Sequence, residues 1–366
     1  MKFIICGGGS GGHVSPAVAI YEELKKRNAE YEFCFVGRSG GRENDAYMKT
    51  GERLYTLNMR GINGKSPIKM LRGAFRAIGS LYEARRILSK ETPSAVIATG
   101  GYVGWPMITV AKRLGIPTLI HESNAYPGLA TRRSVGSADR ILLNYADASR
   151  ILSHPEKTST VGNPIRQEFF SETRLASRRR LGLRDSDFFI LSFGGSLGSE
   201  KMNDELMRLM KNHSSVSKEV KHLHATGRAY FEKADGRELK ALRERGCITL
   251  PYIENMAEVM HAADVVIARA GAMTISEICA VGVASVLIPS PNVADDHQRK
   301  NADLMAQRGA AIVIDERDLT ERRLADAVRE LEVSRARRNQ MGASAKKLAK
   351  KDAASKIADE ILAIAK

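Results

Sequence analysis

The sequence predicts an α/β protein built from two doubly wound, Rossmann-like domains in succession. Short, nearly continuous apolar runs alternate with helical stretches, as in parallel sheets whose strands are buried on both faces. The alternation restarts at residue 188, where another strand runs into another glycine-rich turn. A length of 366 residues also suits two domains.

In the first half, strands and helices follow each other in βαβ order. Strands are expected at residues 2–6, 32–36, 95–99, 117–121 and 140–144. Helices are expected at 16–27, 68–89 and 104–114. The link to the second half is expected near 161–166, because Gly162-Asn163-Pro164 interrupts any regular element.

The second half repeats this order. Strands are expected at 188–193, 221–225, 248–252, 264–268, 285–288 and 311–314. The last residues are predicted to be helical, ending with a helix at 353–365.

Composition limits the class of protein and its partners. No apolar run approaches the ~18 residues of a membrane span, and residues 1–6 are too short for a signal peptide, so a cytoplasmic protein is expected. The four cysteines are widely spaced, which excludes a disulfide scaffold or a zinc ribbon. The net charge of +15 suits a nucleic acid, an anionic membrane surface or a phosphate-bearing substrate.

The first glycine-rich turn lies directly between a strand and a helix. Residues 7–12 contain G-x-G-x-x-G, whose backbone can approach a ligand closely, although a tight structural turn is the alternative. The next strand ends at Arg38 without the acidic residue that NAD binding needs, which leaves NADP open. His13 follows at the helix start, where the dipole favours a neutral imidazole able to act as a base, although a structural histidine is the alternative.

Other strand ends carry further polar or glycine-rich segments. In the first half these are Thr99 to Gly104 and His121 to Asn124, expected at one edge of the sheet. In the second half, residues 194–199 could cradle a phosphate, and Glu277 could hold a ribose or simply cap a helix. Residues 295–298 form an acidic loop, but no second acidic or histidine cluster accompanies it, so no metal is expected.

Much of the excess positive charge lies in one amphipathic window. Between Arg60 and Lys90 there are eight basic residues and one acidic residue, Glu83, interleaved with apolar side chains. We expect this window to dock on an anionic membrane surface, with a solvated helix face as the alternative. The docking residues are predicted to be Lys65, Ile68, Lys69, Leu71, Arg72, Phe75 and Arg76. Residues 335–351 form a second basic stretch.

Several segments in this order and spacing resemble the MurG family of UDP-N-acetylglucosamine transferases. They are GGGSGGHVSPA (7–17), ATGGYVGWP (98–106), HESNAYPG (121–128), VGNPIR (161–166), FGGSLGS (193–199), YIENM (252–256), ADVVIARAGAMTISEI (263–278) and the loop through 295–301. The resemblance implies a GT-B fold, with two Rossmann-like domains facing across a deep cleft. It also implies an acceptor-binding domain at 1–164, a UDP-sugar-binding domain at 165–345, and a C-terminal helix at about 346–366 that packs back on the first domain.

The resemblance implies an inverting transfer of N-acetylglucosamine from UDP to the C4 hydroxyl of the N-acetylmuramoyl-pentapeptide of lipid I, forming lipid II. No cofactor or metal is implied, since UDP-N-acetylglucosamine is a substrate. The implied partners are this donor, the undecaprenyl-linked acceptor and the anionic inner leaflet of the cytoplasmic membrane. The implied location is therefore peripheral, on the cytoplasmic face.

Site residues carry over position by position. The implied catalytic set is His13 as base, with Glu122 orienting the site and Asn124 contacting sugar or acceptor. Substrate contacts are implied for Ser10, Gly11, Gly12, Asn124, Arg166, Ser196, Ile253, Ala272, Met273, Thr274, Ile275, Ser276, Glu277 and Gln298. Of these, Arg166 and Ser196 would contact phosphate, the Ile253 backbone would contact uracil, and Gln298 the sugar hydroxyls.

Four positions depart from the family pattern. Leu197 and Ser123 stand where glutamine is common, Ser199 where alanine is common, and His297 where the first of two glutamines is common.

Three alternative interpretations of the function remain. They are another GT-B enzyme (a glycolipid synthase or a UDP-sugar epimerase), a nicotinamide dehydrogenase, and a basic nucleic-acid-binding protein. The last lacks a helix-turn-helix signature, and aromatic residues make up only 6% of the chain.

Overall fold

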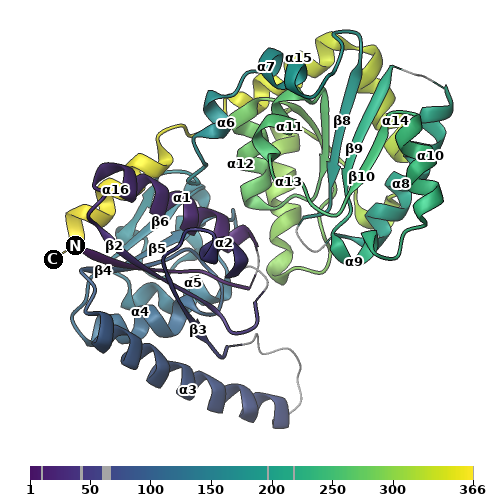
Figure 1. Ribbon diagram of the computed structural model, residues 1–366. Helices are drawn as coiled ribbons and strands as arrows, with labels where there is room; N and C mark the ends of the chain where they lie inside the picture. The colour runs from purple at the N-terminus through teal and green to yellow at the C-terminus, as the bar shows by residue number, and fades with distance from the viewer. Residues whose placement is uncertain (10, 42–43, 60–66, 196–197, 217–218, 366) are drawn as a thin grey trace. The chain divides into compact units, whose positions relative to one another are not determined.

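The computed structural model describes residues 1–9, 11–41, 44–59, 67–195, 198–216 and 219–365, with side chains outside the description at 67–75, 213–216 and 294. The chain divides into two compact units (Figure 1). Unit 1 is Met1–Ile165 with Lys350–Lys366, and unit 2 is Arg166–Ala349.

Unit 1 contains a seven-stranded parallel sheet in the order β3-β2-β1-β4-β5-β6-β7. Its strands are β1 (Lys2–Cys6), β2 (Glu32–Arg38), β3 (Arg53–Leu57), β4 (Ala95–Ala98), β5 (Thr118–Glu122), β6 (Arg140–Leu143) and β7 (Thr158–Thr160). Its helices are α1 (Gly11–Arg27), α2 (Asn44–Met48), α3 (Pro67–Glu91), α4 (Gly104–Arg113), α5 (Leu129–Ser134) and α16 (Ala353–Ile364).

Both faces of this sheet are covered, which explains the apolar runs. Phe3 and Ile5 join the core beneath α1 and α16, whereas Ile4 and Cys6 join the core beneath α3 and α4. Successive side chains of a strand point to opposite faces, so a strand covered on both sides is apolar at every position. Helix α16 is tied to α1 by an Arg27–Asp359 ion pair of 2.5 Å.

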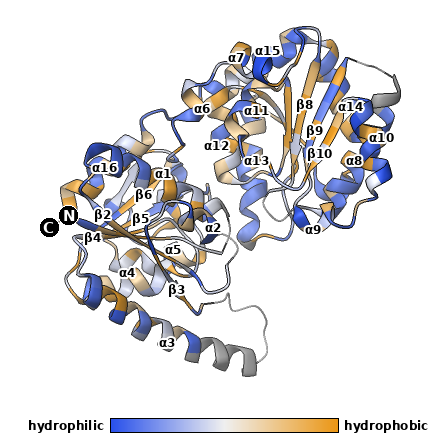
Figure 2. Ribbon diagram, in the orientation of Figure 1, coloured by the Kyte–Doolittle hydropathy of each residue, from blue (hydrophilic) through white to orange (hydrophobic). Residues whose placement is uncertain are grey.

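Unit 2 contains a six-stranded parallel sheet in the order β10-β9-β8-β11-β12-β13. Its strands are β8 (Phe188–Phe193), β9 (Val220–Ala225), β10 (Cys247–Leu250), β11 (Val265–Ala268), β12 (Ala284–Leu287) and β13 (Ile312–Val313). Its helices are α6 (Glu168–Ser171), α7 (Arg174–Arg180), α8 (Glu200–Val216), α9 (Arg228–Phe231), α10 (Gly236–Glu244), α11 (Met256–Ala262), α12 (Ala272–Val281), α13 (His297–Gln307), α14 (Glu321–Val333) and α15 (Arg335–Lys346). Hydrophobic residues concentrate along β8 (Figure 2).

The expected doubly wound sheets are present, and the differences concern the edges of the first sheet and the start of α1. The edge strands β3 and β7 were not expected, because they contain exposed and polar positions and therefore lack the continuous apolar run that identifies a central strand. Helix α1 begins at Gly11 instead of residue 16, so Pro16 lies inside it. None of the helices in the described part of the chain combines the length and hydropathy that crossing a membrane requires.

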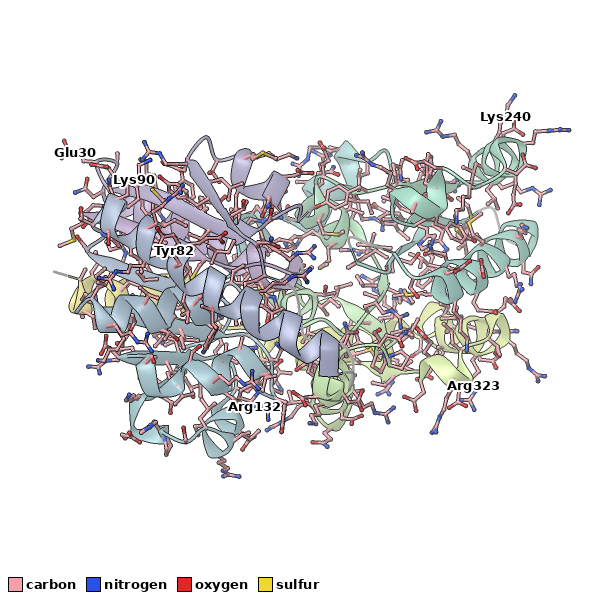
Figure 3. All side chains as sticks on the ribbon, turned by 90° about the horizontal axis from the view of Figure 1, so that it is seen from below. Glu30, Tyr82, Lys90, Arg132, Lys240 and Arg323 are labelled. Carbon is pink, nitrogen blue, oxygen red and sulfur yellow. The ribbon has the colours of Figure 1, made fainter. Side chains whose placement is uncertain are left out.

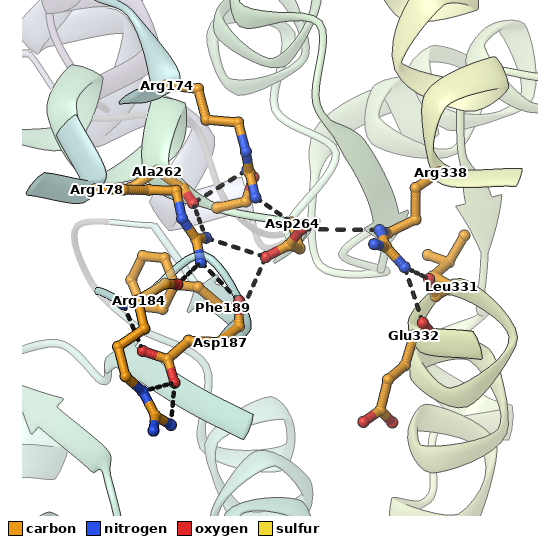
Figure 4. Close-up of polar contacts among 11 residues, drawn as sticks. Arg174, Arg178, Arg184, Asp187, Phe189, Ala262, Asp264, Leu331, Glu332 and Arg338 are labelled. Atoms are coloured by element: carbon orange, nitrogen blue, oxygen red, sulfur yellow. Dashed lines mark hydrogen bonds and ion pairs between the residues drawn. The ribbon is translucent and has the colours of Figure 1, made fainter. Parts of the chain in front are cut away.

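A buried ionic cluster holds together the amino end of the second sheet (Figure 4). The Asp264 carboxylate, 9% exposed, accepts hydrogen bonds from the Phe189 backbone N at 2.9 Å, from Arg174 at 2.8 Å and from Arg178 at 3.3 Å. Arg178 also donates to the carbonyls of Ala262, Arg184 and Asp187. This cluster therefore joins α7 to β8 and β11.

Replacing Asp264 should destabilise unit 2. Asp264→Ala leaves the buried guanidinium of Arg178 without its counter-charge, and we expect the free energy of unfolding to fall by about 3–5 kcal/mol. Urea denaturation measures this change. As a control, Glu330→Ala removes the exposed ion pair with Arg337 and should cost less than ~1 kcal/mol. Equal losses for both variants would contradict the structural role of Asp264.

Candidate functional site

In unit 1, two glycine-rich loops meet where the strand order reverses between β1 and β4, the position at which doubly wound sheets bind ligands. Gly101 has a φ of +80°, and a Cβ there would lie 1.8 Å from the carbonyl oxygen of Gly8. The Thr99 hydroxyl donates to the backbone carbonyl of His13 at 2.6 Å. Any side chain at Gly101 would therefore separate the two loops, which explains the glycine requirement that the sequence indicated.

His13 lies in the first turn of α1 and is held in one orientation. Its Nδ1 is 3.1 Å from the Gly8 carbonyl oxygen. A carbonyl only accepts, so Nδ1 is the protonated nitrogen of the neutral ring and Nε2 carries the lone pair. Its ring also packs against Gly100, where a Cβ would lie 2.5 Å from His13 Cδ2. This arrangement gives His13 the tautomer that a general base using Nε2 requires.

Glu122, at the end of β5, organises the segment that follows it. Its carboxylate is buried, and Oε1 accepts from both the backbone N and Nδ2 of Asn124 at 3.0 Å. Oε2 accepts from the Gly128 backbone N at 3.0 Å and from the Thr131 hydroxyl at 2.6 Å. With four donors on two oxygens, Glu122 is suited to positioning Asn124 and less suited to exchanging protons with a substrate.

In unit 2, the loop after β8 contacts the loop after β9. The strand order reverses between β8 and β11, the position that corresponds to the reversal in unit 1. Gly198 has a φ of +74°, and a Cβ there would lie 2.0 Å from the Thr226 carbonyl oxygen. Helix α12 starts after Gly271, an N-cap that has no side chain to cover the helix end. The positive end of the helix dipole therefore faces the loop region, an arrangement that suits a phosphate. Ser10 and Ser196 lie outside the described residues.

Helix α12 carries a carboxylate with an unusual pKa. Glu277 is the sixth residue of α12, in its second turn, and its burial raises its pKa to about 7. Arg166 opposes this rise and Glu168 adds to it. Arg166 forms an ion pair with Glu168 at 2.9 Å, and its guanidinium lies 5.5 Å from the centre of the Phe169 ring. A cation and two carboxylates thus share one electrostatic environment.

The remaining predicted contacts lie on helices α12 and α13 and on the loop after β10, all in unit 2. The Ser276 hydroxyl donates to the Ala272 carbonyl at 3.0 Å, so it turns toward its own helix. Gln298 Oε1 accepts from the Ser290 backbone N at 2.9 Å, and Ile253 is 3% exposed in the loop before α11. Asp295 and Asp296 both have positive φ, at 54° and 50°. Two successive left-handed non-glycine residues carry backbone strain of the kind that clusters at ligand sites.

One buried cation of this region, Arg269, is given no function by the sequence motifs. Arg269 was part of the quoted motif, but only the structure shows its four hydrogen-bonding partners on three other loops. Its position directly after a strand was the one sequence feature that could have suggested a role for Arg269.

In the described part of the chain, no group of three or more His, Cys, Asp and Glu side chains could hold a metal ion.

The predicted membrane-docking window is described only in part. Lys65 lies outside the described residues, and Ile68, Lys69, Leu71, Arg72 and Phe75 lie on α3 with side chains outside the description. Arg76 is exposed, as are Ile78 at 65% and Tyr82 at 73%, one helical turn apart. Figure 3 shows this helix with Tyr82 and Lys90 labelled.

Comparisons with known proteins identify the family. Residues 3–143 match the glycosyltransferase family 28 N-terminal domain, and residues 189–357 match the C-terminal domain of the same family. A UDP-N-acetylglucosamine–N-acetylmuramyl-(pentapeptide) pyrophosphoryl-undecaprenol N-acetylglucosamine transferase from Thermoanaerobacter sp. is 38% identical over 360 residues, which cover 98% of both chains. The chain belongs to the MurG family. A Geobacter sulfurreducens protein of the same name is 35% identical over 99% of this chain and 98% of its own.

A solved MurG structure agrees with this assignment. The MurG of Acinetobacter baumannii superposes with a TM-score of 0.74 at 25% identity, covering 99% of each chain. The expected GT-B fold of two Rossmann-like domains is confirmed, and the protein is a glycosyltransferase. MurG membership removes the dehydrogenase and nucleic-acid-binding alternatives.

Proposed function

We propose that the protein transfers N-acetylglucosamine from UDP-N-acetylglucosamine to the C4 hydroxyl of the N-acetylmuramoyl-pentapeptide of lipid I, forming lipid II. Similarity over almost the whole chain to transferases named for this reaction carries the proposal. Residues 1–164 would form the acceptor domain, completed by the C-terminal helix, and residues 165–345 the donor domain.

The reaction inverts the anomeric centre in one displacement. His13 Nε2 takes the proton of the acceptor hydroxyl as its oxygen bonds to the anomeric carbon, and the bond from that carbon to the diphosphate breaks. UDP leaves with the electron pair. The start of α12 and Arg166 would stabilise the charge on the diphosphate, and Glu277 would accept hydrogen bonds from the ribose hydroxyls.

Transfer from labelled UDP-N-acetylglucosamine to a short-chain lipid I analogue tests this function. We expect labelled lipid II to form equally with and without EDTA. No transfer to the analogue would refute the assignment, and release of a sugar epimer without acceptor would point instead to an epimerase. Loss of activity only in EDTA would refute a metal-independent mechanism.

Glu168 is expected to compete with the donor for Arg166. Since a bound diphosphate would have to replace the Glu168 carboxylate, Glu168→Gln should raise UDP affinity. An exposed ion pair contributes about 0.4–1 kcal/mol, so UDP should bind about two- to fivefold more tightly. Titration calorimetry measures this change. Glu172→Gln removes a neighbouring carboxylate that pairs with Arg180, and should leave UDP affinity unchanged. Unchanged affinity in Glu168→Gln would exclude this competition.

We further propose that α3 docks the protein on the anionic inner leaflet, where a lipid-linked acceptor would reside. The exposed Ile78 and Tyr82 provide apolar area, and Arg85 and Arg86 are exposed on the same helix. Apolar side chains in the interface and basic residues near anionic lipids both strengthen such binding.

Reversing the charge of Lys65, Lys69, Arg72 and Arg76 should abolish most of this docking. At ~1 kcal/mol for each basic residue, binding to anionic vesicles should weaken by at least ~10²-fold in a sedimentation assay. The matched control reverses four exposed charges on and beside α10, which are Arg237, Lys240, Arg243 and Arg245. Unchanged binding of the α3 variant, or equal weakening in the control, would exclude specific docking through α3.

A further inference from the structure

Arg269 is a buried cation at the carboxyl end of the second sheet. It follows β11 directly, and its side chain is 11% exposed. Nη1 donates to the carbonyls of Ile288 at 3.2 Å and Pro289 at 3.3 Å. Nη2 donates to the Ser199 hydroxyl at 2.5 Å and forms an ion pair with Glu316. A buried guanidinium is costly unless it is paired and hydrogen-bonded, and these partners supply that compensation.

The partners of Arg269 come from separate strand ends. Ser199 ends the glycine-rich loop after β8, Ile288 and Pro289 follow β12, and Glu316 lies in the short helical turn Glu316–Asp318 after β13. With its own strand β11, one side chain thus connects four of the six strand ends in this sheet.

Further contacts hold this network in place. Asn301 Nδ2 donates to the Ala270 carbonyl at 3.3 Å, next to Arg269. Lys201, in the first turn of α8, donates to the Glu316 carbonyl. The planar guanidinium has a fixed set of donor directions, so its bonds constrain distance and angle together. Loops held in this way keep a preformed geometry, which lowers the ordering cost of ligand binding.

The Ser199 contact gives the network a link to the glycine-rich loop in this chain. Serine stands here where the MurG pattern commonly has alanine, which could not accept a hydrogen bond from Arg269. Two residues beyond Arg269, Gly271 is the N-cap of α12. Arg269 therefore connects Ser199, at the end of the loop after β8, to the segment that leads into α12.

We propose that Arg269, held by Glu316, is a positioning residue that sets the placement of Ser199, at the end of the loop after β8, relative to the start of α12 and so determines affinity for the nucleoside diphosphate. This inference rests on the proposed donor site. Arg269 acts through the loops that it connects, and needs no contact with the ligand.

The alternative is that Arg269 only stabilises the unit, and Arg178 provides a matched control for it. Arg178 is a buried arginine of the same unit, 5% exposed, that donates to backbone carbonyls and to Asp264 (Figure 4). It lies at the amino end of the same sheet, away from the loops after β8 and β11. Replacing each arginine by lysine keeps the charge and removes the planar fork.

The experiment compares UDP affinity and stability in wild type, Arg269→Lys, Glu316→Gln, Ser199→Ala and Arg178→Lys. Calorimetry with UDP gives the affinity, and urea denaturation gives the stability. We expect UDP affinity to fall about tenfold in Arg269→Lys and about two- to fivefold in Ser199→Ala. The loss in Glu316→Gln should lie between these two values. Losses of this size correspond to the loss of one or a few hydrogen bonds. Arg178→Lys should lose stability and keep wild-type affinity. In the transfer assay, Arg269→Lys should raise KM for the donor more than it lowers kcat.

Ser199→Ala removes only one hydroxyl, so it keeps the test valid if Arg269→Lys does not fold. Wild-type UDP affinity in folded Arg269→Lys or in Ser199→Ala would overturn the positioning role alone. Equal losses of affinity in Arg178→Lys would also overturn it, by showing a general effect of stability. If the wild-type protein does not bind UDP, the proposed donor site and this inference both fail.

Discussion

His13→Ala should lower kcat by about 10²–10⁴-fold, the usual contribution of a general base. The Gly8 carbonyl fixes the His13 ring so that Nε2 carries the lone pair. Without this ring, the described residues of the two glycine-rich loops offer no other imidazole and no carboxylate to take the proton of the acceptor hydroxyl in the proposed reaction. Steady-state transfer to a lipid I analogue measures the loss.

Two controls separate chemistry from folding and binding. UDP affinity should change little in His13→Ala, because the proposed contacts of Arg166, Ile253 and Glu277 with UDP lie in unit 2. His154→Ala, which removes an exposed histidine paired with Glu156, should keep wild-type turnover. A His13→Ala enzyme that retains a third or more of the wild-type kcat would exclude His13 as the base.

UDP affinity should depend on pH through Glu277. Burial raises the pKa of Glu277 to about 7, with Glu168 adding to the shift and Arg166 opposing it. The proposed ribose contact needs the ionised carboxylate, since only that form accepts both hydroxyl hydrogen bonds. Affinity should therefore be highest above pH 7 and fall by up to about tenfold for each pH unit below it.

Variants of Glu277 test the origin of this dependence. Glu277→Ala should weaken UDP binding by about 10–100-fold. Each hydrogen bond to a charged group is worth ~1.5–3 kcal/mol, and the rest of the binding site should offset part of the loss. Glu277→Gln should bind weakly at every pH and lose the dependence near pH 7. Titration of the diphosphate itself affects both proteins equally. A Glu277→Gln protein with the wild-type pH profile would refute the ribose role.

The central strands and the interlocking loops could be predicted from sequence, as could the edge strands β10 and β13 of the second sheet, whereas the edge strands β3 and β7 of the first sheet could not. Strands β1 and β8 match their expected limits, because a strand covered on both faces must be apolar throughout. Strand β3, with Arg53 and Thr56 exposed at the sheet edge, lacks that pattern. Glycines such as Gly101 could be recognised because any Cβ there would collide with the Gly8 backbone.

The hydrogen-bond networks of the site were not predictable. Glu122 is only two residues from Asn124, yet its other partners, Gly128 and Thr131, follow from the path of the next loop. The pKa of Glu277 depends on its burial and on the nearby charges of Arg166 and Glu168, which the order of residues does not reveal. Arg166 was expected to contact phosphate, but its pairing with Glu168 appears only in the folded unit.

By itself, the sequence determined the two α/β domains, the positions of the glycine-rich turns and the family, because these depend on local patterns of apolar and glycine residues. Tertiary structure alone decided which strand ends become neighbours. Arg269, Ser199 and Glu316 are separated by up to 117 residues, and they meet because β8, β11, β12 and β13 lie side by side in one parallel sheet. A parallel sheet brings all its carboxyl ends to one edge, so the order of its strands determines which polar groups form the site.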